Sequence, residues 1–490
     1  MIVSHKHKFI FFKSRKTAGS SIQVSLAKHC GPEDIITGQY RLGIDDNSHS
    51  AGLNMDKFYT NHPHPQLVQT KKFLGPEVWN NYFKFSFVRN PFDIAVSRYH
   101  WNLKGKDNNL STSIEGFEKW VEQGNLLRED SLSLYTCDND KIDLDFIGYY
   151  ETLEDDLDYI CQKIGIPNVN LPTLKSGFRD SKNYTNFYNE NTKNIVSTFY
   201  QNDINTFNYS FKPDFYTKNP KSIINSSIAK DNNINGPSII KVPDFIQNKL
   251  GDYYLYFAHH DGKHIKLAYS NNLEGPWTLY KEGTLQLADT ECITHIASPD
   301  VHVVDNQIVM YYHGDTEDGQ HSFKALSSDG INFNSINEKL GSFYFRVFDY
   351  LGETYSIAKN GNTDGIIYKK DNNKFIPQFN LIDNIRHSAV YVDNNILYIF
   401  YSIVGEAPES LYIAKIKNWE IISNYKFKEP KYDWEGAEKT KTNSRFGASF
   451  SFVNELRDPC IFEEEDNLYL LYSYGGESGI AISKLVKNEN

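Results

Sequence analysis

The sequence predicts two folded domains of different class: an α/β domain with a mostly parallel sheet over residues 1–215, and an all-β five-bladed propeller over residues 236–490. The length of 490 residues exceeds what one hydrophobic core usually supports. The first part alternates short apolar runs with helical stretches, which is typical of βα units. The second part has short strands rich in Tyr, Ile and Val between polar turns. We expect the Asn-rich stretch 216–235 to be a linker.

Composition excludes several classes of protein. The net charge is −11, so we expect no general nucleic-acid binder, because such proteins need a basic surface. Aromatic residues make up 14% of the chain, which favours strands and surfaces that stack on sugar rings. No segment approaches the roughly 18 apolar residues of a membrane span, and the N-terminus does not read as a signal peptide.

The cysteines indicate a reducing compartment. The chain has five, an odd number, and they are far apart without the paired spacings of zinc sites or disulfide frameworks. We therefore expect a cytoplasmic protein with reduced thiols. They are Cys30, Cys137, Cys161, Cys292 and Cys460.

The stretch KSRKTAGSS predicts a phosphate-binding turn. It follows a buried strand at Phe9–Phe12 and precedes a helix over Ile22–His29, so helix N–H groups can face an anion. Lys16 adds a positive charge and Thr17 a hydroxyl. Small residues let the backbone approach the ligand closely; they are Ala18, Gly19, Ser20 and Ser21. Taken alone, this motif also fits an ordinary strand-to-helix connection.

A second motif, FKFSFVRNPFDIAVSRYH, strengthens the first. A buried strand runs into Arg89, and a helix then carries Ser97 on its exposed side. An arginine at a strand end with a serine two helical turns later suits a second phosphate. A nucleoside triphosphate P-loop would instead show GxxxxGK[ST], so a nucleotide kinase is the weaker interpretation.

Together the two motifs resemble the 5′-phosphosulfate loop and the 3′-phosphate segment of the cytosolic and Golgi sulfotransferases, particularly the carbohydrate-directed branch. The resemblance extends to about residue 212. It implies an α/β P-loop-like sulfotransferase domain, a parallel sheet flanked by helices, with 3′-phosphoadenosine-5′-phosphosulfate (PAPS) as co-substrate. Lys16 to Ser21 would hold the 5′-phosphosulfate, and Arg89 with Ser97 the 3′-phosphate.

The resemblance also directs attention to three other segments. Many relatives carry an arginine where this chain has Tyr149 and Tyr150 before Glu151. Arg179 and Lys182 could fold over the nucleotide, or belong to an exposed loop. The segment TNHPHPQ supplies His62, with His64 as the alternative, where related enzymes have a histidine.

These residues suggest roles in sulfuryl transfer. Lys16 would stabilise charge on the bridging oxygen of the leaving nucleotide. His62 or His64 would remove the acceptor proton, although a His-Pro loop can also be a simple turn.

The C-terminal part shows about five repeats of roughly 40 to 50 residues, the size of propeller blades. It resembles the propellers of arabinanase-like and fructosidase-like glycosidases in pieces such as HIASPDVHVV and ELRDPCIFEE. That resemblance makes Asp300 and Asp458 candidate catalytic carboxylates, with Glu406 and Glu435 as candidate acids. Where such glycosidases usually have an aspartate in the first blade, this chain has Gly236.

Five histidines lie at expected strand ends facing the centre of the propeller. They could bind a divalent metal or lie beside a sugar, and each could equally be a structural histidine. They are His259, His260, His295, His313 and His387. No metal-ligand set is assigned.

The predicted function is transfer of a sulfuryl group from PAPS to a hydroxyl of a carbohydrate or glycoconjugate acceptor, with a propeller that binds glycan and could hydrolyse it. Three alternatives remain open. The main activity could be glycoside hydrolysis with an accessory N-terminal domain, the N-terminal domain could be a nucleotide kinase, or the propeller could be a protein-interaction scaffold.

Overall fold

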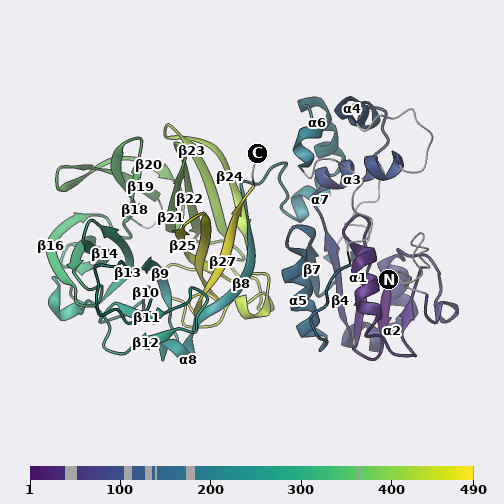
Figure 1. The fold of residues 1–490 in the computed structure, drawn as a ribbon, viewed down its shortest axis with the longest axis horizontal. Coiled ribbons are helices and arrows are strands. Elements are labelled where there is room, and N and C mark those ends of the chain that lie inside the picture. Colours follow the sequence, from purple (N-terminus) through teal and green to yellow (C-terminus); the bar gives the residue numbers. More distant parts are fainter. Residues whose placement is uncertain are drawn as a thin grey trace. The chain divides into compact units, whose positions relative to one another are not determined.

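The computed structural model describes the chain except residues 39–51, 104–112, 127–134, 138–140, 173–182, 362–363 and 489–490. The chain divides into two compact units (Figure 1). One unit contains Met1–Phe215 together with Asn488–Asn490, and the other contains Tyr216–Lys487. In the described part of the chain, no helix is both long and apolar enough to cross a membrane.

The N-terminal unit is built on a five-stranded sheet in the order β3-β1-β2-β4-β7. The strands β2, β4 and β7 are parallel, whereas β1 pairs antiparallel with both β2 and β3. The sheet is therefore mixed, and the expectation of a mostly parallel sheet was wrong at its N-terminal edge, where a tight hairpin joins β1 to β2. The strands are β1 (Ile2–Ser4), β2 (Phe9–Phe11), β3 (Ile35–Ile36), β4 (Phe83–Val88) and β7 (Phe146–Tyr149).

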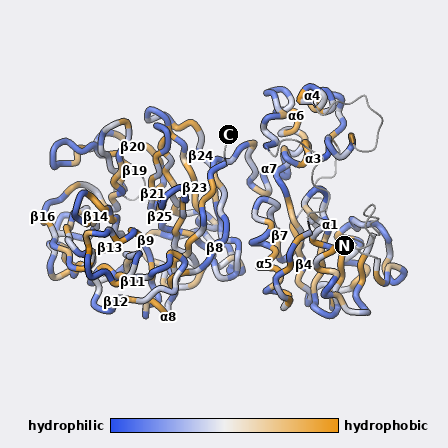
Figure 2. The backbone as a smooth tube through the Cα atoms, viewed as in Figure 1, coloured by the Kyte–Doolittle hydropathy of each residue, from blue (hydrophilic) through white to orange (hydrophobic). Residues whose placement is uncertain are grey.

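Helices surround this sheet, as the sequence predicted. The strands β2 and β4 are buried throughout or nearly so, which is typical of strands covered on both faces. Figure 2 shows hydrophobic residues along β4 and β7. The helices are α1 (Gly19–Ala27), α2 (Leu67–Asn81), α3 (Pro91–Leu103), α4 (Ile114–Glu122), α5 (Leu153–Lys163), α6 (Glu190–Phe199) and α7 (Gln201–Thr206).

The C-terminal unit is a five-bladed propeller of five four-stranded sheets within the described residues, as predicted. The first blade contains β9 (Asn235–Lys241), β10 (Tyr253–Ala258), β11 (Lys266–Ser270) and β12 (Thr278–Tyr280). The second contains β13 (Ile296–Val304), β14 (Gln307–Thr316), β15 (Gly319–Ser327) and β16 (Asn334–Gly341). The third contains β17 (Arg346–Tyr350), β18 (Glu353–Asn360), β19 (Asp364–Asp371) and β20 (Lys374–Ile382). The fourth contains β21 (Ile385–Asp393), β22 (Ile396–Ile403), β23 (Leu411–Lys417) and β24 (Glu420–Lys428).

The fifth blade closes the ring and overturns the expected linker. It contains β25 (Leu456–Glu464), β26 (Asn467–Tyr474) and β27 (Gly479–Lys487), with β8 (Phe215–Asn225) as its outer strand. Most of the stretch 216–235 is thus β8, the short helix α8 (Ser226–Ala229) and the approach to β9. Its polar composition misled the prediction because the middle of an outer strand is largely solvent-exposed, while Ile223 and Ile224 are buried.

Candidate functional site

The turn between β2 and α1 forms a concave backbone at the N-terminus of the helix. Lys16 and Ala18 have φ of 62° and 60°, a left-handed conformation that is uncommon for residues with a side chain. The helix has no side-chain cap and no acidic residue in its first turn. The first N–H groups of a helix lack intrahelical acceptors and carry partial positive charge. This geometry is compatible with anion binding at residues 16–21, which stays a prediction.

Lys13 completes this turn, although the sequence analysis did not select it. Its Nζ donates to Ser20 Oγ at 3.1 Å, and its side chain is buried. A Cβ at Gly19 would lie 2.8 Å from Lys13 Cγ, so only glycine allows this approach. The position of Lys13 directly after a buried strand was the signal that could have identified it.

Arg89 follows β4 and joins the second motif to the first. Its guanidinium is buried, donates from Nε to Asp93 Oδ2 at 2.8 Å, and donates from Nη1 to the Lys16 carbonyl at 2.8 Å. Its Cζ lies 3.9 Å from the centroid of the Tyr150 ring. Burial alone would lower the pKa of Arg89, but the charge of Asp93 raises it, so the residue stays cationic. The cationic guanidinium of Arg89 therefore contacts the backbone of the turn between β2 and α1.

Two further side chains extend the site around Lys16 and Arg89. Ser97 is half-buried on α3 and lies four residues after Asp93, so both face the same side of the helix as the guanidinium. Lys16 Nζ lies 4.5 Å from the centroid of the Trp101 ring, a cation–π distance. The side chains of Lys16 and Ser97 thus come from elements that meet at the end of the parallel strands.

His62 and His64 lie next to each other, with ring centroids 5.8 Å apart. The Nδ1 of His64 lies 2.7 Å from the Lys13 carbonyl, which can only accept, so Nδ1 carries the proton and Nε2 is left as an acceptor. His62 is exposed, and its Nδ1 contacts the His64 carbonyl at 2.9 Å. Burial lowers the pKa of His64 to about 3. Of the two histidines, His64 is the one that contacts the turn.

In the propeller, Asp300 forms a tie between blades. Its Oδ2 accepts from the backbone N–H of Val347 at 2.9 Å, which joins β13 to β17, and it pairs with His302 at 2.9 Å. Burial alone would raise the pKa of Asp300, but the charge of His302 lowers it. Asp300 therefore links the second and third blades through one of its oxygens.

Asp458 forms a comparable tie between the fifth and first blades. Its Oδ2 accepts from the Gly236 N–H at 3.2 Å and from Ser473 Oγ at 3.0 Å, and its Oδ1 pairs with His387. Burial would raise the pKa of Asp458, but His387 lowers it below its usual range. Gly236 has a φ of 59°, and a Cβ there would lie 3.1 Å from Ser298 Cα.

The two candidate acids, Glu406 and Glu435, also accept hydrogen bonds from protein side chains. Glu435 is fully buried, accepts from Tyr472 Oη at 2.6 Å and pairs with Lys428 Nζ at 2.9 Å. Glu406 accepts a hydrogen bond from Tyr412 Oη. Each predicted propeller carboxylate therefore already has a protein donor.

Four of the five predicted histidines form a continuous row with one tyrosine. The ring centroids of His260 and His295 are 6.4 Å apart, and those of His295 and His313 are 5.7 Å apart. The ring of Tyr344 then lies 4.3 Å from His313 and 4.2 Å from His387. Burial lowers the pKa of His313 well below its usual value.

His259, the fifth predicted histidine, lies outside this row, and the described residues show no site for the divalent metal that the sequence left open. His259 does not share these ring contacts and instead lies beside the Phe450 ring at 5.9 Å. Among the described residues, no group of three or more His, Cys, Asp or Glu side chains is placed to hold a metal ion.

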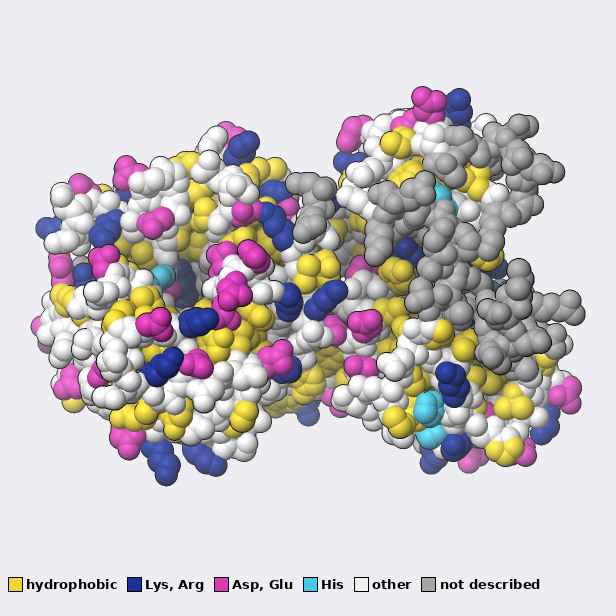
Figure 3. Space-filling view, in the orientation of Figure 1, with side chains coloured by type: hydrophobic (Ala, Val, Ile, Leu, Met, Phe, Trp, Pro, Cys, Tyr) yellow, Lys and Arg dark blue, Asp and Glu magenta, His cyan; other side chains and the backbone are white. Residues whose placement is uncertain are grey.

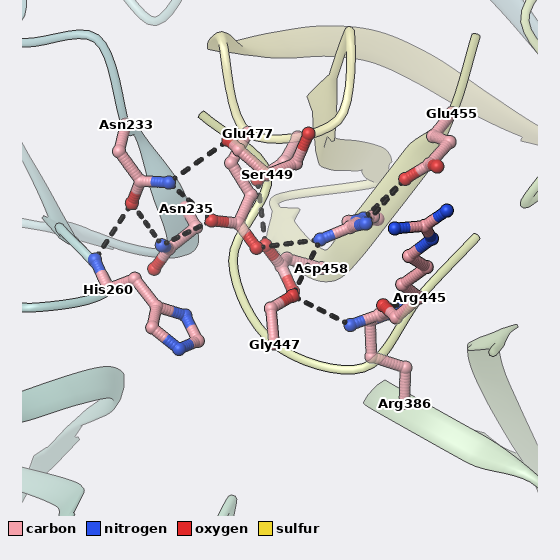
Figure 4. Close-up of polar contacts among 12 residues, drawn as sticks. Asn233, Asn235, His260, Arg386, Arg445, Gly447, Ser449, Glu455, Asp458 and Glu477 are labelled. Atoms are coloured by element: carbon pink, nitrogen blue, oxygen red, sulfur yellow. Dashed lines mark hydrogen bonds and ion pairs between the residues drawn. The ribbon is translucent and has the colours of Figure 1, made fainter. Parts of the chain in front are cut away.

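A buried network of charges lies next to this row (Figure 4). Arg457 pairs with Glu455 at 2.5 Å and with Glu477 at 2.9 Å, and Arg386 pairs with Glu409 at 2.7 Å. All five side chains are buried. Because unpaired buried charges are costly, the two arginines are needed to keep these three glutamates in place.

Backbone carbonyls of the loop 445–449 occupy the outer side of the same network. Arg386 and Arg457 both donate from Nη1 to the Gly447 carbonyl, at 3.3 Å and 3.2 Å. Asn233 donates from Nδ2 to the Ser449 carbonyl at 3.2 Å, and Figure 4 shows it bridging His260 and Glu477. The loop is thereby fixed over these polar side chains.

Comparison with known proteins identifies the family of the N-terminal unit. Residues 1–210 match the model of the Sulfotransferase family. The N-terminal domain belongs to the sulfotransferase family. The chain is 30% identical over 301 residues to the uncharacterized protein R118 of Acanthamoeba polyphaga mimivirus, covering 52% of this chain and 85% of that protein. It is 22% identical over 250 residues to carbohydrate sulfotransferase 10 of Xenopus laevis, covering 44% of this chain and 65% of that protein.

A solved structure of a thermostable family-43 glycoside hydrolase is similar to the chain at 15% identity and a TM-score of 0.35. The similarity covers 53% of this chain and 90% of that one. The five sheets described above define the propeller on their own.

Two predicted residues of the sulfotransferase domain cannot be placed. Arg179 and Lys182 lie outside the described residues. The other predicted donor-site residues lie on the turn, at the end of β4 or on α3, which are consecutive elements around the parallel strands.

Proposed function

We propose that the sulfotransferase domain transfers a sulfuryl group from PAPS to a hydroxyl of a carbohydrate acceptor. The observation that supports this most directly is the turn at residues 13–21, where an uncapped helix N-terminus lies beside Lys13 and Lys16, with Arg89 under it. Phosphate and sulfate groups need this combination of N–H groups and cations. In this proposal residues 16–21 hold the 5′-phosphosulfate, and Arg89 with Ser97 the 3′-phosphate.

Lys16 has the central role in the transfer. The acceptor oxygen forms a bond to sulfur while the bond from sulfur to the 5′-phosphate oxygen breaks, and negative charge accumulates on that leaving oxygen. A cation at this position stabilises the transition state more than the bound substrate. Trp101, beside Lys16 Nζ, limits where the ammonium can move.

His64, rather than His62, is the better candidate for the general base. It is neutral at physiological pH, and its Nε2 is free to accept because Nδ1 is committed to the Lys13 carbonyl. A pKa near 3 makes a weak base, but a bound phosphosulfate would raise the pKa because nearby negative charge favours the protonated form. His64→Ala should lower kcat by about 10²-fold or more, the usual contribution of a general base. His62→Ala is the matched control.

We propose glycan binding, rather than hydrolysis, for the propeller. The row from His260 to His387 with Tyr344 offers neutral rings and hydrogen-bonding nitrogens of the kind that sugars contact. Hydrolysis needs one carboxylate to act as base and another as acid, yet Asp300 and Asp458 are held by neighbouring blades. Hydrolysis of aryl glycosides that is lost in Asp300→Asn and Asp458→Asn would restore the hydrolase alternative.

The cellular location belongs to the same proposal. The described cysteines Cys30, Cys161, Cys292 and Cys460 are free thiols. Free thiols are usual in a reducing compartment, which supports a cytoplasmic enzyme.

The first experiment is calorimetric titration of the full chain with adenosine 3′,5′-bisphosphate, the nucleotide product. Saturable binding to the wild-type protein is expected, and its absence would remove the donor assignment. The second experiment measures transfer of labelled sulfate from PAPS to a panel of glycans. Transfer to a non-carbohydrate hydroxyl alone would contradict the acceptor class, and phosphate transfer from ATP would favour the kinase alternative.

A further inference from the structure

A pocket of ≈ 780 Å³ lies at the first propeller blade, and none of the four histidines of the row lines it. It is formed by α8 and the residues that follow it, by the loop before β11, and by β12. This volume is within the range of sites for small organic ligands. Figure 3 shows Lys and Arg side chains along this edge of the propeller, beside the positions that Figure 1 labels α8 and β12.

The charge of this pocket is opposite to that of the chain. Four lysines and two aspartates line it, a net charge of +2, whereas the whole chain carries −11. Asp231 is neutralised locally, because it pairs with Lys266 Nζ at 2.5 Å and lies 3.5 Å from His259 Nε2. Burial alone would raise the pKa of Asp231, but the hydrogen bond and charge of Lys266 lower it, so the carboxylate stays ionised.

Two lysines of the pocket are available to a ligand. Lys263 donates to the Thr294 carbonyl, but Lys230 and Lys281 are exposed and have no hydrogen bond or ion pair to other described residues. Lys230 also has a φ of 53°, an unfavourable conformation for lysine at the end of α8. An anion in the pocket would give both ammonium groups a partner.

The remaining wall suits the face of a sugar ring. Trp277, Leu279 and Tyr280 line the pocket with aromatic and aliphatic surface. Trp277 is only 6% exposed, and its Nε1–H has no acceptor among the described residues. Less than 1 Å² of this nitrogen is exposed, so the N–H lies beneath the pocket wall and out of reach of a ligand.

We propose that this pocket binds a sulfated saccharide, with sulfate held by Lys230 and Lys281 and the sugar ring beside Trp277 and Tyr280. The choice of sulfate over another anion rests on the proposed function, because a sulfated glycan is the class of product that this sulfotransferase would form. The pocket would then retain the chain on glycan that already carries sulfate.

The test titrates the full chain with three tetrasaccharides in the presence of saturating adenosine 3′,5′-bisphosphate. The probes are chondroitin 4-sulfate, its chemically desulfated form, which keeps the carboxylates, and neutral chitotetraose. Removing the sulfates should weaken binding about tenfold or more, because charge-assisted contacts are lost. Equal affinity for the sulfated and desulfated forms would overturn the assignment of sulfate, and no binding of the sulfated form would overturn the site.

Matched variants locate the binding. The double variant Lys230→Glu/Lys281→Glu should weaken binding of chondroitin 4-sulfate about tenfold or more, since both cations become repulsive. The control Lys370→Glu/Lys374→Glu makes the same charge change at exposed positions of the third blade, outside the pocket, and should change the affinity no more than about twofold. Unchanged affinity in the first double variant would refute the proposal.

The nucleotide titration separates this inference from the proposed function. If adenosine 3′,5′-bisphosphate binds but the sulfated tetrasaccharide does not, the pocket assignment fails and the sulfotransferase proposal stands. If the saccharide binds through Lys230 and Lys281 but the nucleotide does not bind, the donor assignment fails and the pocket remains a site for sulfated sugar.

Discussion

Arg89 donates a hydrogen bond from Nη1 to the carbonyl of Lys16, at 2.8 Å. The two residues are 73 positions apart in the chain, and this bond fixes the backbone of the turn at a residue with a positive φ. Arg89 therefore supports the shape of the 5′ site in addition to its proposed contact with the 3′-phosphate. Substitutions at the two positions should consequently have different effects on binding and turnover.

Lys16→Ala should separate turnover from binding. The substitution removes the ammonium that would stabilise the leaving oxygen but keeps the backbone N–H groups of the turn. We expect kcat to fall about 10²–10³-fold, as for loss of one transition-state donor, while affinity for adenosine 3′,5′-bisphosphate changes less than about tenfold. Sulfate transfer and calorimetry provide the two measurements. Lys28→Ala, at the exposed end of α1, is the control, and an equal loss of kcat there would contradict the assignment.

Arg89→Lys should impair nucleotide binding more than folding. Lysine keeps a charge near Asp93, but a single ammonium cannot reproduce the planar fork that reaches both Asp93 and the Lys16 carbonyl. We expect affinity for adenosine 3′,5′-bisphosphate to fall about tenfold or more. Arg89→Ala should in addition lower the free energy of unfolding by about 3–5 kcal/mol, because it breaks the buried ion pair with Asp93. Wild-type affinity in Arg89→Lys would show that the guanidinium is dispensable.

The stability of the propeller should fall as pH falls below about 6.5. Burial lowers the pKa of His313 and His295, so the unfolded chain binds more protons than the folded one once pH drops below the ordinary histidine pKa. Each such histidine contributes a slope of up to about 1.4 kcal/mol per pH unit in this window. Urea unfolding at several pH values measures it. His313→Gln should reduce the slope whatever its effect at pH 7.5, and an unchanged slope would mean that His313 is protonated in the fold.

An isolated propeller should need β8. A fragment over residues 214–488 retains Phe215, Ile223 and Ile224, whereas a fragment over residues 236–488 exposes the edge of β27 and removes part of the core beneath it. Loss of buried apolar side chains costs about 1.5–3 kcal/mol each, so the shorter fragment should unfold at clearly lower urea concentration or aggregate. Chemical unfolding and size-exclusion chromatography compare the two. Equal stability would mean that β8 adds nothing to the ring.

Features with a local signature were predictable from the sequence. The turn at Lys16 and the five blades follow from apolar runs and small residues that are adjacent in the chain. Features that depend on distant partners could not be predicted. The strand Phe215–Asn225 has a polar sequence, and only its pairing with β27 shows that it belongs to the fifth blade. The antiparallel pairing of β1 with β2 likewise had no sequence signal that we used.

In the candidate sites, too, local features were predictable from the sequence and contacts with distant residues were not. Asp300 and Asp458 have the sequence context of catalytic carboxylates, but only the fold shows that one oxygen of each accepts from the backbone N–H of Val347 or Gly236 in a neighbouring blade. Lys13 could have been selected from its place after β2, because its role is local. Arg89 was selected for a phosphate, while its bond to the Lys16 carbonyl required the fold.

The pairing of β8 with β27 also orders events during synthesis. The sulfotransferase domain is made first and contains nearly all of its own strands and helices, so it can fold while the ribosome is still translating the blades. The segment Phe215–Asn225 must then wait, unpaired, until Gly479–Lys487 leaves the ribosome. In that interval its polar middle residues protect it, because an exposed edge with Lys218 and Lys221 is a poor template for aggregation.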